Sequence, residues 1–369
     1  MSAAKAGGGG RTTLAACAGR ALSRIAPAIG ALALAWSATA SASVVRSFVA
    51  TNGSDSNTAA NCAPTTPCRT FTAALGVTAA GGEVIALNSG GYGPFTVTQS
   101  ATIVAPPGVY AGIVVASGAG VTVNGAGITV TLRGLTINGT GGSSGIAYVN
   151  GLALNVENLT ISNFSGSGGA GILATAIQRT GAGAVNASLR VIDSVVLDCL
   201  NGIDVQDGPN VSVVRTRFLG TLAGSARSMA TGLLYTVATE SDTQLVTVVD
   251  SVVNDGVGTA FSVQNGGSGA IVMAIDRTVV RGGSVGVSAT GAGKTTLTIS
   301  NCVLAGLGTA VLSQSAGAGP GPAVYLNNDQ VFDDTTGVQA AAGGAVDSFG
   351  NNAFGKNGAD GTATALPLE

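Results

Sequence analysis

Acidic and basic side chains that could act together are concentrated in residues 190–217. Only 9% of the chain is charged, but this stretch contains Arg190, Asp193, Asp198, Asp204, Asp207, Arg215 and Arg217. Asp204 and Asp207 are predicted to form a calcium or sugar site, with Arg215 or Arg217 as a base or a clamp for a carboxylate. The alternative is that these are ordinary surface charges, with Asp193 and Arg215 used in turns.

The rest of the composition limits the chemistry further. The chain of 369 residues has no histidine, which excludes Ser-His-Asp and Cys-His nucleophiles and the commonest zinc ligands. Two other motifs are incomplete. The pair Asp333-Asp334 has no histidine or Arg-x-Lys partner, and the phosphate-loop-like segment 291–295 has no following helix. No catalytic residue, no metal ligand and no cofactor is predicted, except calcium if the acidic cluster is an active site.

The N-terminal segment has the order of a secretory signal peptide. Four basic residues, Lys5, Arg11, Arg20 and Arg24, precede an uncharged run and then small residues up to Ala42. The apolar run is shorter than the roughly 20 residues that a membrane-spanning helix needs. We therefore predict cleavage near residue 42, secretion or a periplasmic location, and no membrane insertion afterwards.

The mature chain is expected to be acidic. Removal of four of the 16 basic residues leaves 12 against 18 acidic ones. Because binding to nucleic acid needs clustered Lys and Arg, a nucleic-acid partner is not expected. In an oxidising compartment, Cys62 and Cys68 are predicted to close a short disulfide loop, whereas Cys199 and Cys302 are predicted to be buried thiols.

An internal repeat is the strongest signal for the fold. A Gly or Ala followed by an apolar residue recurs at intervals of about 24 to 33 residues. The members are Gly112-Ile113, Gly145-Ile146, Gly171-Ile172, Gly202-Ile203, Gly232-Leu233, Ala260-Phe261, Gly286-Val287, Ala310-Val311 and Gly337-Val338. The pattern predicts a coil of parallel strands, one turn per repeat, whose core is a column of Val, Ile, Leu and Ala.

A second motif lies between these pairs and defines the faces of the coil. It is an apolar-x-apolar segment that ends in Asn, Asp, Arg or Gly, as in Leu154–Asn158, Leu189–Asp193 and Leu297–Asn301. The terminal Asn and Asp are predicted to occupy left-handed turns and to stack from turn to turn. Arg133 is predicted to pair with Glu157 on the next turn. In the first motif, the first and third residues after the Gly or Ala are predicted to point inward, and the fourth is predicted to face outward.

The N-terminal end of the coil is expected to be covered. Residues Thr70–Leu75 are predicted to form a short capped helix that places Phe71, Ala74 and Leu75 over the end of the core. The domain boundaries predicted from these features are 1–42 for the signal peptide, 43–82 for the capping segment, 83–355 for the coil and 356–369 for a C-terminal tail.

Four segments resemble a known family: Phe48–Asp55, Pro67–Phe71, Gly81–Ile85 and Leu297–Val303. Together they resemble secreted bacterial right-handed parallel β-helix repeat proteins of the pectate-lyase-like fold, over about residues 46–355. The resemblance implies an all-β solenoid of about nine to ten turns. It is hardly specific for activity, because polysaccharide lyases, glycoside hydrolases, esterases and adhesins share the fold.

Two functional hypotheses follow from these observations. The first is an exported β-solenoid with a structural, surface or glycan-contacting role and no identifiable catalytic centre, whose partner is an extracellular or cell-wall polysaccharide. The alternative is a polysaccharide lyase or glycoside hydrolase that acts on acidic glycans through Asp204, Asp207, Arg215 and Arg217.

Overall fold

The computed structural model describes residues 43–175, 186–220, 229–239, 241–254, 256–317, 319 and 321–367. The predicted signal peptide, residues 1–42, lies outside this part of the chain. None of the described residues belongs to a helix long and apolar enough to cross a membrane.

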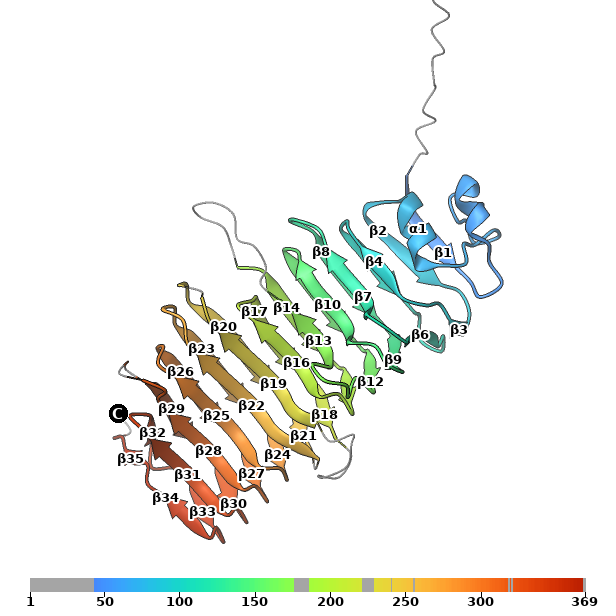
Figure 1. Ribbon diagram of the computed structural model, residues 1–369. Coiled ribbons are helices and arrows are strands. Elements are labelled where there is room, and N and C mark those ends of the chain that lie inside the picture. Colours follow the sequence, from blue (N-terminus) through green and yellow to red (C-terminus); the bar gives the residue numbers. More distant parts are fainter. Residues whose placement is uncertain are drawn as a thin grey trace, which may run out of the picture. The chain divides into compact units, whose positions relative to one another are not determined.

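Three parallel sheets, which we call A, B and C, wind around one core, and from β2 onward successive strands of the chain go to A, B and C in turn (Figure 1). Sheet A contains β1 (Val44–Val49), β2 (Thr78–Ala86), β5 (Ala101–Val104), β8 (Thr129–Arg133), β11 (Ala153–Glu157), β14 (Ser188–Ile192), β17 (Asn210–Val214), β20 (Gln244–Val249), β23 (Ile271–Asp276), β26 (Thr295–Ser300), β29 (Pro322–Asn327), β32 (Ala345–Ser348) and β35 (Thr364–Ala365). Sheet B contains β3 (Gly90–Gly91), β6 (Ala111–Val115), β9 (Leu135–Gly139), β12 (Thr160–Ser162), β15 (Val195–Leu197), β18 (Arg217–Leu219), β21 (Val252–Val253), β24 (Val279–Arg281), β27 (Val303–Ala305), β30 (Gln330–Phe332) and β33 (Ala353–Gly355).

Sheet C contains β4 (Phe95–Val97), β7 (Ala119–Asn124), β10 (Ser144–Asn150), β13 (Ala170–Ala174), β16 (Asn201–Gln206), β19 (Met229–Val237), β22 (Val257–Asn265), β25 (Val285–Gly291), β28 (Thr309–Gln314), β31 (Thr336–Ala341) and β34 (Ala359–Gly361). Every strand pairing is parallel and joins a strand to the equivalent strand of the next turn, as in β10 with β13. The predicted class, an all-β parallel β-helix, is confirmed.

The Gly-apolar repeat marks sheet C, with one exception. Ile146 pairs in register with Ile172, and Ile172 with Ile203, so these pairs occupy the same place on successive turns. Gly112-Ile113 was assigned wrongly, because it lies in β6 of sheet B. Its place in sheet C is taken by Gly120-Val121, since Val121 pairs with Ile146.

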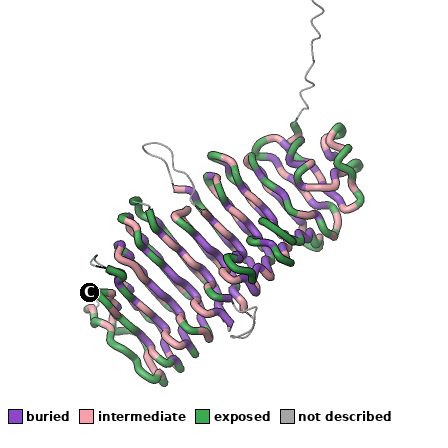
Figure 2. Tube along the Cα trace, viewed as in Figure 1, coloured by how far each residue is buried: buried purple, intermediate pink, exposed green. Residues whose placement is uncertain are grey.

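The predicted inward and outward faces of sheet C are also confirmed. From Gly145 to Ala310, residues one and three positions after the Gly or Ala are buried, and those four positions after are exposed or half-buried (Figure 2). In the last member, Gly337-Val338, Ala340 is exposed. Tyr148, Tyr235 and Phe261 are among the largest fully buried side chains. The rings of Phe218 and Phe261 meet edge to face at 6.3 Å between centroids. Cys199 and Cys302 are buried free thiols, and burial raises the pKa of each to about 12.

The N-terminal end is covered as the sequence predicts. Helix α1 (Phe71–Val77) begins after Thr70, whose hydroxyl accepts a hydrogen bond from Ala73 N at 3.2 Å. A 3₁₀ helix, η1 (Asp55–Ala60), precedes it. The disulfide Cys62–Cys68 is present, and its loop bonds to β1 because Cys68 N donates to Phe48 O at 3.0 Å.

The sheets extend past both predicted boundaries of the coil. Strand β1 lies in the segment assigned to capping, but it pairs with β2 and forms the first strand of sheet A. Strands β34 and β35 lie in the segment assigned to the C-terminal tail, and they pair with β31 and β32. These strands lack the repeat motifs because they end the coil and have a neighbouring turn on one side only.

Candidate functional site

From β8 to β32, the turn after each strand of sheet A contains one residue in the left-handed conformation. The series is Gly134, Asn158, Asp193, Arg215, Asp250, Arg277, Asn301, Asn328 and Gly350, with φ between 46° and 78°. Asn and Asp suit this conformation because their short side chains hydrogen-bond locally. The predicted turn residues are therefore confirmed, and two arginines occupy the same position.

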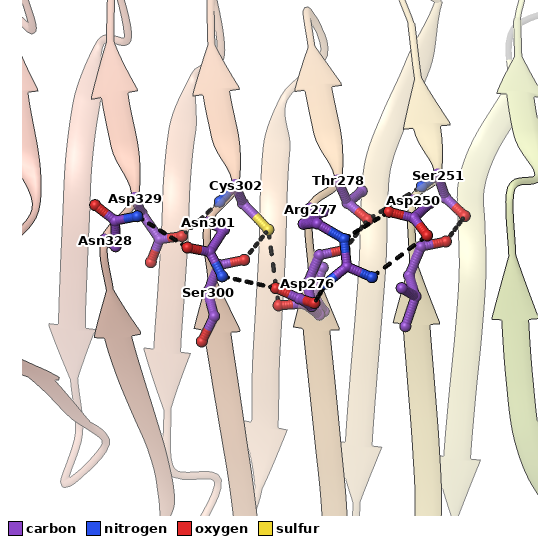
Figure 3. Close-up of polar contacts among 12 residues, drawn as sticks. Asp250, Ser251, Asp276, Arg277, Thr278, Ser300, Asn301, Cys302, Asn328 and Asp329 are labelled. Carbon is purple, nitrogen blue, oxygen red and sulfur yellow. Dashed lines mark hydrogen bonds and ion pairs between the residues drawn. The ribbon is translucent and has the colours of Figure 1, made fainter.

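The side chains of this series form a line of polar contacts on the surface. Arg215 Nε lies 2.6 Å from Asp193 Oδ1, and Arg277 Nε lies 2.7 Å from Asp250 Oδ1. The contacts continue at the C-terminal side (Figure 3), where Asn301 Nδ2 donates to Asp276 Oδ1 at 2.9 Å and Asn328 Nδ2 donates to Asn301 Oδ1 at 2.8 Å. Arg277 also pairs with Asp276.

These ion pairs favour the charged form of the two aspartates. The hydrogen bond from Arg215 lowers the pKa of Asp193, and that from Arg277 lowers the pKa of Asp250. Both carboxylates therefore stay ionised to a lower pH than an unpaired aspartate does. The four side chains are 39% to 55% exposed, so each pair contributes little to stability in water.

A groove of about 720 Å³ lies at the N-terminal part of this line. Pro106 and Pro107 form an apolar part of its lining, and Val104 and Ile192 contribute aliphatic surface from sheet A. The charged lining residues are Arg133, Glu157, Arg190, Asp193 and Arg215. The lining thus combines apolar surface with several charges, an arrangement that suits a ligand with both kinds of group.

The three arginines of the groove differ in their partners. Arg133 Nη2 lies 2.6 Å from Glu157 Oε2, as predicted, and Arg215 pairs with Asp193. Arg190 is exposed and makes no hydrogen bond or ion pair with any residue that the structure describes. Its guanidinium is therefore the group in the groove that is available to bind an anion.

The four predicted binding residues lie on different parts of the coil. Asp204 is on the outer side of sheet C in β16, 6% exposed, where it accepts from Asn201 Nδ2 at 3.0 Å. Asp207 follows β16 and accepts from the backbone N of Ala238 at 2.6 Å. Arg217 is in β18 of sheet B. Only Arg215 lines the groove, and a joint role for the four stays a prediction.

Sequence reasoning missed the strand that supplies Asp276 and Arg277. The segment Ile271–Asp276 forms β23, which pairs in register with β20 and β26. It has the same apolar-x-apolar pattern as its neighbours, with Ile271, Met273 and Ile275 buried. The spacing of the turn residues is the signal that could have revealed this strand, because Arg277 follows Asp250 by 27 residues, one turn of the coil.

Two buried carboxyl groups lie in turns near the C-terminal end. Asp329 Oδ1 accepts from Cys302 N at 2.8 Å, and Asp334 Oδ1 accepts from Leu307 N at 2.7 Å. Burial raises the pKa of each carboxyl to about 6, although the backbone hydrogen bonds act in the opposite direction. The Oδ2 atom of Asp334 is buried and has no hydrogen-bond partner among the residues that the structure describes.

Because of these two carboxyl groups, we expect the free energy of unfolding to depend on pH. The folded protein holds their protons up to about pH 6, whereas unfolded aspartates release them near pH 3.8. Their contribution to the free energy of unfolding is thus complete below about pH 4 and is lost as the pH rises through 6. Asp334→Asn should weaken this loss, so urea unfolding at pH 4 and pH 7 should show a smaller difference for the variant. An equal difference in both proteins would contradict the assignment for Asp334.

Comparison with known proteins shows likeness at the level of the fold. No protein-family model and no curated protein matches the sequence. Among solved structures, pectate lyase Pel9A aligns at 13% identity and a TM-score of 0.48, over 88% of this chain and 81% of its own. A rhamnogalacturonan lyase aligns at 12% identity and a TM-score of 0.31, over 78% and 74% of the two chains. The strand order and pairing of the chain itself make it a parallel β-helix.

Proposed function

We propose that this protein binds an acidic polysaccharide in the groove on sheet A, with Arg190 as the anchoring cation. The observation that carries the proposal is the state of the three arginines: Arg133 and Arg215 are paired, and Arg190 is not. A guanidinium presents a planar fork of donors that matches a carboxylate. The ligand class is therefore a polymer with uronate groups.

The surroundings of Arg190 suit an extended ligand. In sheet A, Arg190 pairs in register with Asn155 on the preceding turn and with Ser212 on the following turn. Thr131 and Thr247 continue the same row at either side. Neighbouring strands are about 4.8 Å apart, so this row offers a hydrogen-bonding side chain at short, regular intervals along the coil. A polymer lying along the row would meet Arg190 near the middle.

The paired arginines support this role indirectly. Glu157 and Asp193 pair with Arg133 and Arg215, and their negative charges offset those of the two arginines on either side of Arg190. A site with one available cation favours a modest affinity for each sugar unit, and repeated contacts along a polymer add to it. Such a ligand lies outside the cell, and the signal peptide predicted in residues 1–42 would supply the export that this role requires.

The variant Arg190→Gln tests the proposal. It should lower the affinity for polygalacturonate at least tenfold, because a hydrogen bond to a charged group contributes about 1.5–3 kcal/mol. Isothermal titration calorimetry at low ionic strength measures the effect. The matched control is Arg281→Gln, since Arg281 is an exposed arginine on sheet B outside the groove. If both variants bind as the native protein does, or if the native protein binds no uronate polymer, the proposal fails.

A further inference from the structure

A second pocket lies at the ends of strands β9 and β12 of sheet B. It has a volume of about 500 Å³, and it is lined by Asn138, Thr140, Asn163 and Ser165, together with glycines. No Asp, Glu, Lys or Arg lines it among the described residues. A charged ligand would therefore lose hydration in this pocket without gaining an ionic partner, so the pocket favours a neutral ligand.

Two amides of this pocket are joined by a hydrogen bond that fixes their direction. Asn138 Oδ1 accepts from Asn163 Nδ2 at 2.6 Å and from Ser162 Oγ at 3.2 Å. Asn138 Nδ2 and Asn163 Oδ1 make no hydrogen bond with any residue that the structure describes. The pair thus leaves one donor and one acceptor unused. A hydroxyl group can accept from the first and donate to the second, whereas an ionised carboxylate only accepts and an ammonium group only donates.

An exposed tyrosine lies beside this pocket on the outer side of sheet B. Tyr110 is 52% exposed, and its ring covers Gly112, because a Cβ built on Gly112 would lie 2.7 Å from an edge atom of the ring. In the sheet, Gly112 pairs with Thr136, and the exposed Val114 pairs with Asn138. Gly112 and Asn138 are thus one strand and two residues apart, or about 8 Å between their Cα atoms.

The backbone of Tyr110 is held at both of its polar groups. Its N–H donates to Ser89 Oγ at 3.0 Å, and its carbonyl oxygen accepts from Gly90 N at 2.8 Å. The phenol hydroxyl makes no hydrogen bond within the part of the chain that the structure describes. The ring is therefore attached to a fixed backbone, and it presents apolar surface with a polar tip to solvent.

We infer that Tyr110 and this pocket together bind a polysaccharide of neutral sugars. A sugar ring has an apolar face of C–H groups, which can pack on Tyr110 and Val114, and hydroxyl groups, which match the unused donor and acceptor of Asn138 and Asn163. A chain of sugars can meet both parts of the site at once. This site is on sheet B, separate from the groove on sheet A, and it does not depend on Arg190.

Isothermal titration calorimetry of the full chain with cellohexaose, xylohexaose and mannohexaose tests the inference. Saturable binding of at least one of these neutral oligosaccharides is expected. Tyr110→Ala should weaken it about tenfold, because the aromatic surface is lost. Tyr110→Phe, which keeps the ring, should bind more tightly than Tyr110→Ala. Asn138→Ala should weaken binding about fivefold, because it removes the unused donor.

Control variants separate this site from the rest of the surface. Leu245→Ala is the matched control for Tyr110→Ala, since Leu245 is 50% exposed but lies on sheet A. It should bind the neutral oligosaccharides as the native protein does, and so should Arg190→Gln. Tyr110→Ala should in turn leave the affinity for polygalacturonate unchanged.

Three results would overturn the inference, and none of them bears on the role of Arg190. The first is that the native protein binds none of the three hexasaccharides. The second is that Tyr110→Ala or Asn138→Ala binds them as tightly as the native protein. The third is that these two variants weaken the binding of polygalacturonate and not that of a neutral oligosaccharide.

Discussion

Phe261→Ala is expected to lower the free energy of unfolding by about 3–5 kcal/mol, the usual range for removing a buried phenylalanine from a core. Phe261 is fully buried on the inner side of β22. Its ring meets Phe218, which enters the core from β18 of sheet B, at an interplanar angle of 87°. Aromatic residues make up only 4% of the chain, so the small aliphatic neighbours are poorly suited to fill the space that the ring would leave.

Urea unfolding of the native protein, Phe261→Ala, Phe218→Ala and the double variant measures this effect. Because the two rings touch, the double-mutant cycle should give a coupling of about 0.5–1.5 kcal/mol. Tyr110→Ala is the control, because Tyr110 is 52% exposed and its loss should change stability by less than about 0.5 kcal/mol. A loss below about 1 kcal/mol for Phe261→Ala would show that the core is not packed around this ring.

Sequence reasoning could predict the fold because the coil repeats one physical requirement. Each turn must bury the same side of three strands, so the Gly-apolar pair of sheet C recurs in register, as Ile146, Ile172 and Ile203 do. Gly112-Ile113 has the same pattern but lies in sheet B, because that sheet also contains short apolar strands. The residue types were the same there, and only the pairing of Val121 with Ile146 distinguishes the two sheets.

The groove was harder to predict because it depends on which turns are neighbours. Arg133, Arg190 and Arg215 are far apart in the sequence, but they lie on turns that stack closely, and all three line one groove with Pro106. The number of residues between strands varies along the chain, so sequence distance does not report the distance along the coil. The density of charges along the sequence groups Arg215 with Asp204, although Asp204 lies on sheet C.

Close contact between turns gives the glycine of the repeat a physical explanation. A Cβ built on Gly202 would lie 2.4 Å from the carbonyl oxygen of Gly232 on the next turn and 2.8 Å from the ring of Phe218. Both distances are too short for a real contact, and the carbonyl belongs to the backbone, which cannot move without disturbing the sheet. Ala260 and Ala310 occupy the same position on other turns, so a methyl group is tolerated at some of them.

Gly202→Val should consequently destabilise the protein by about 3 kcal/mol or more, because its branched side chain must displace both the next turn and the aromatic ring. Gly91→Val is the matched control, since Gly91 is also a strand residue but a Cβ there meets no atom within 4 Å. In urea unfolding, the free energies of unfolding of the two variants should differ by most of this 3 kcal/mol. If instead they unfold at the same denaturant concentration, glycine at position 202 is not required by the approach of the neighbouring turn.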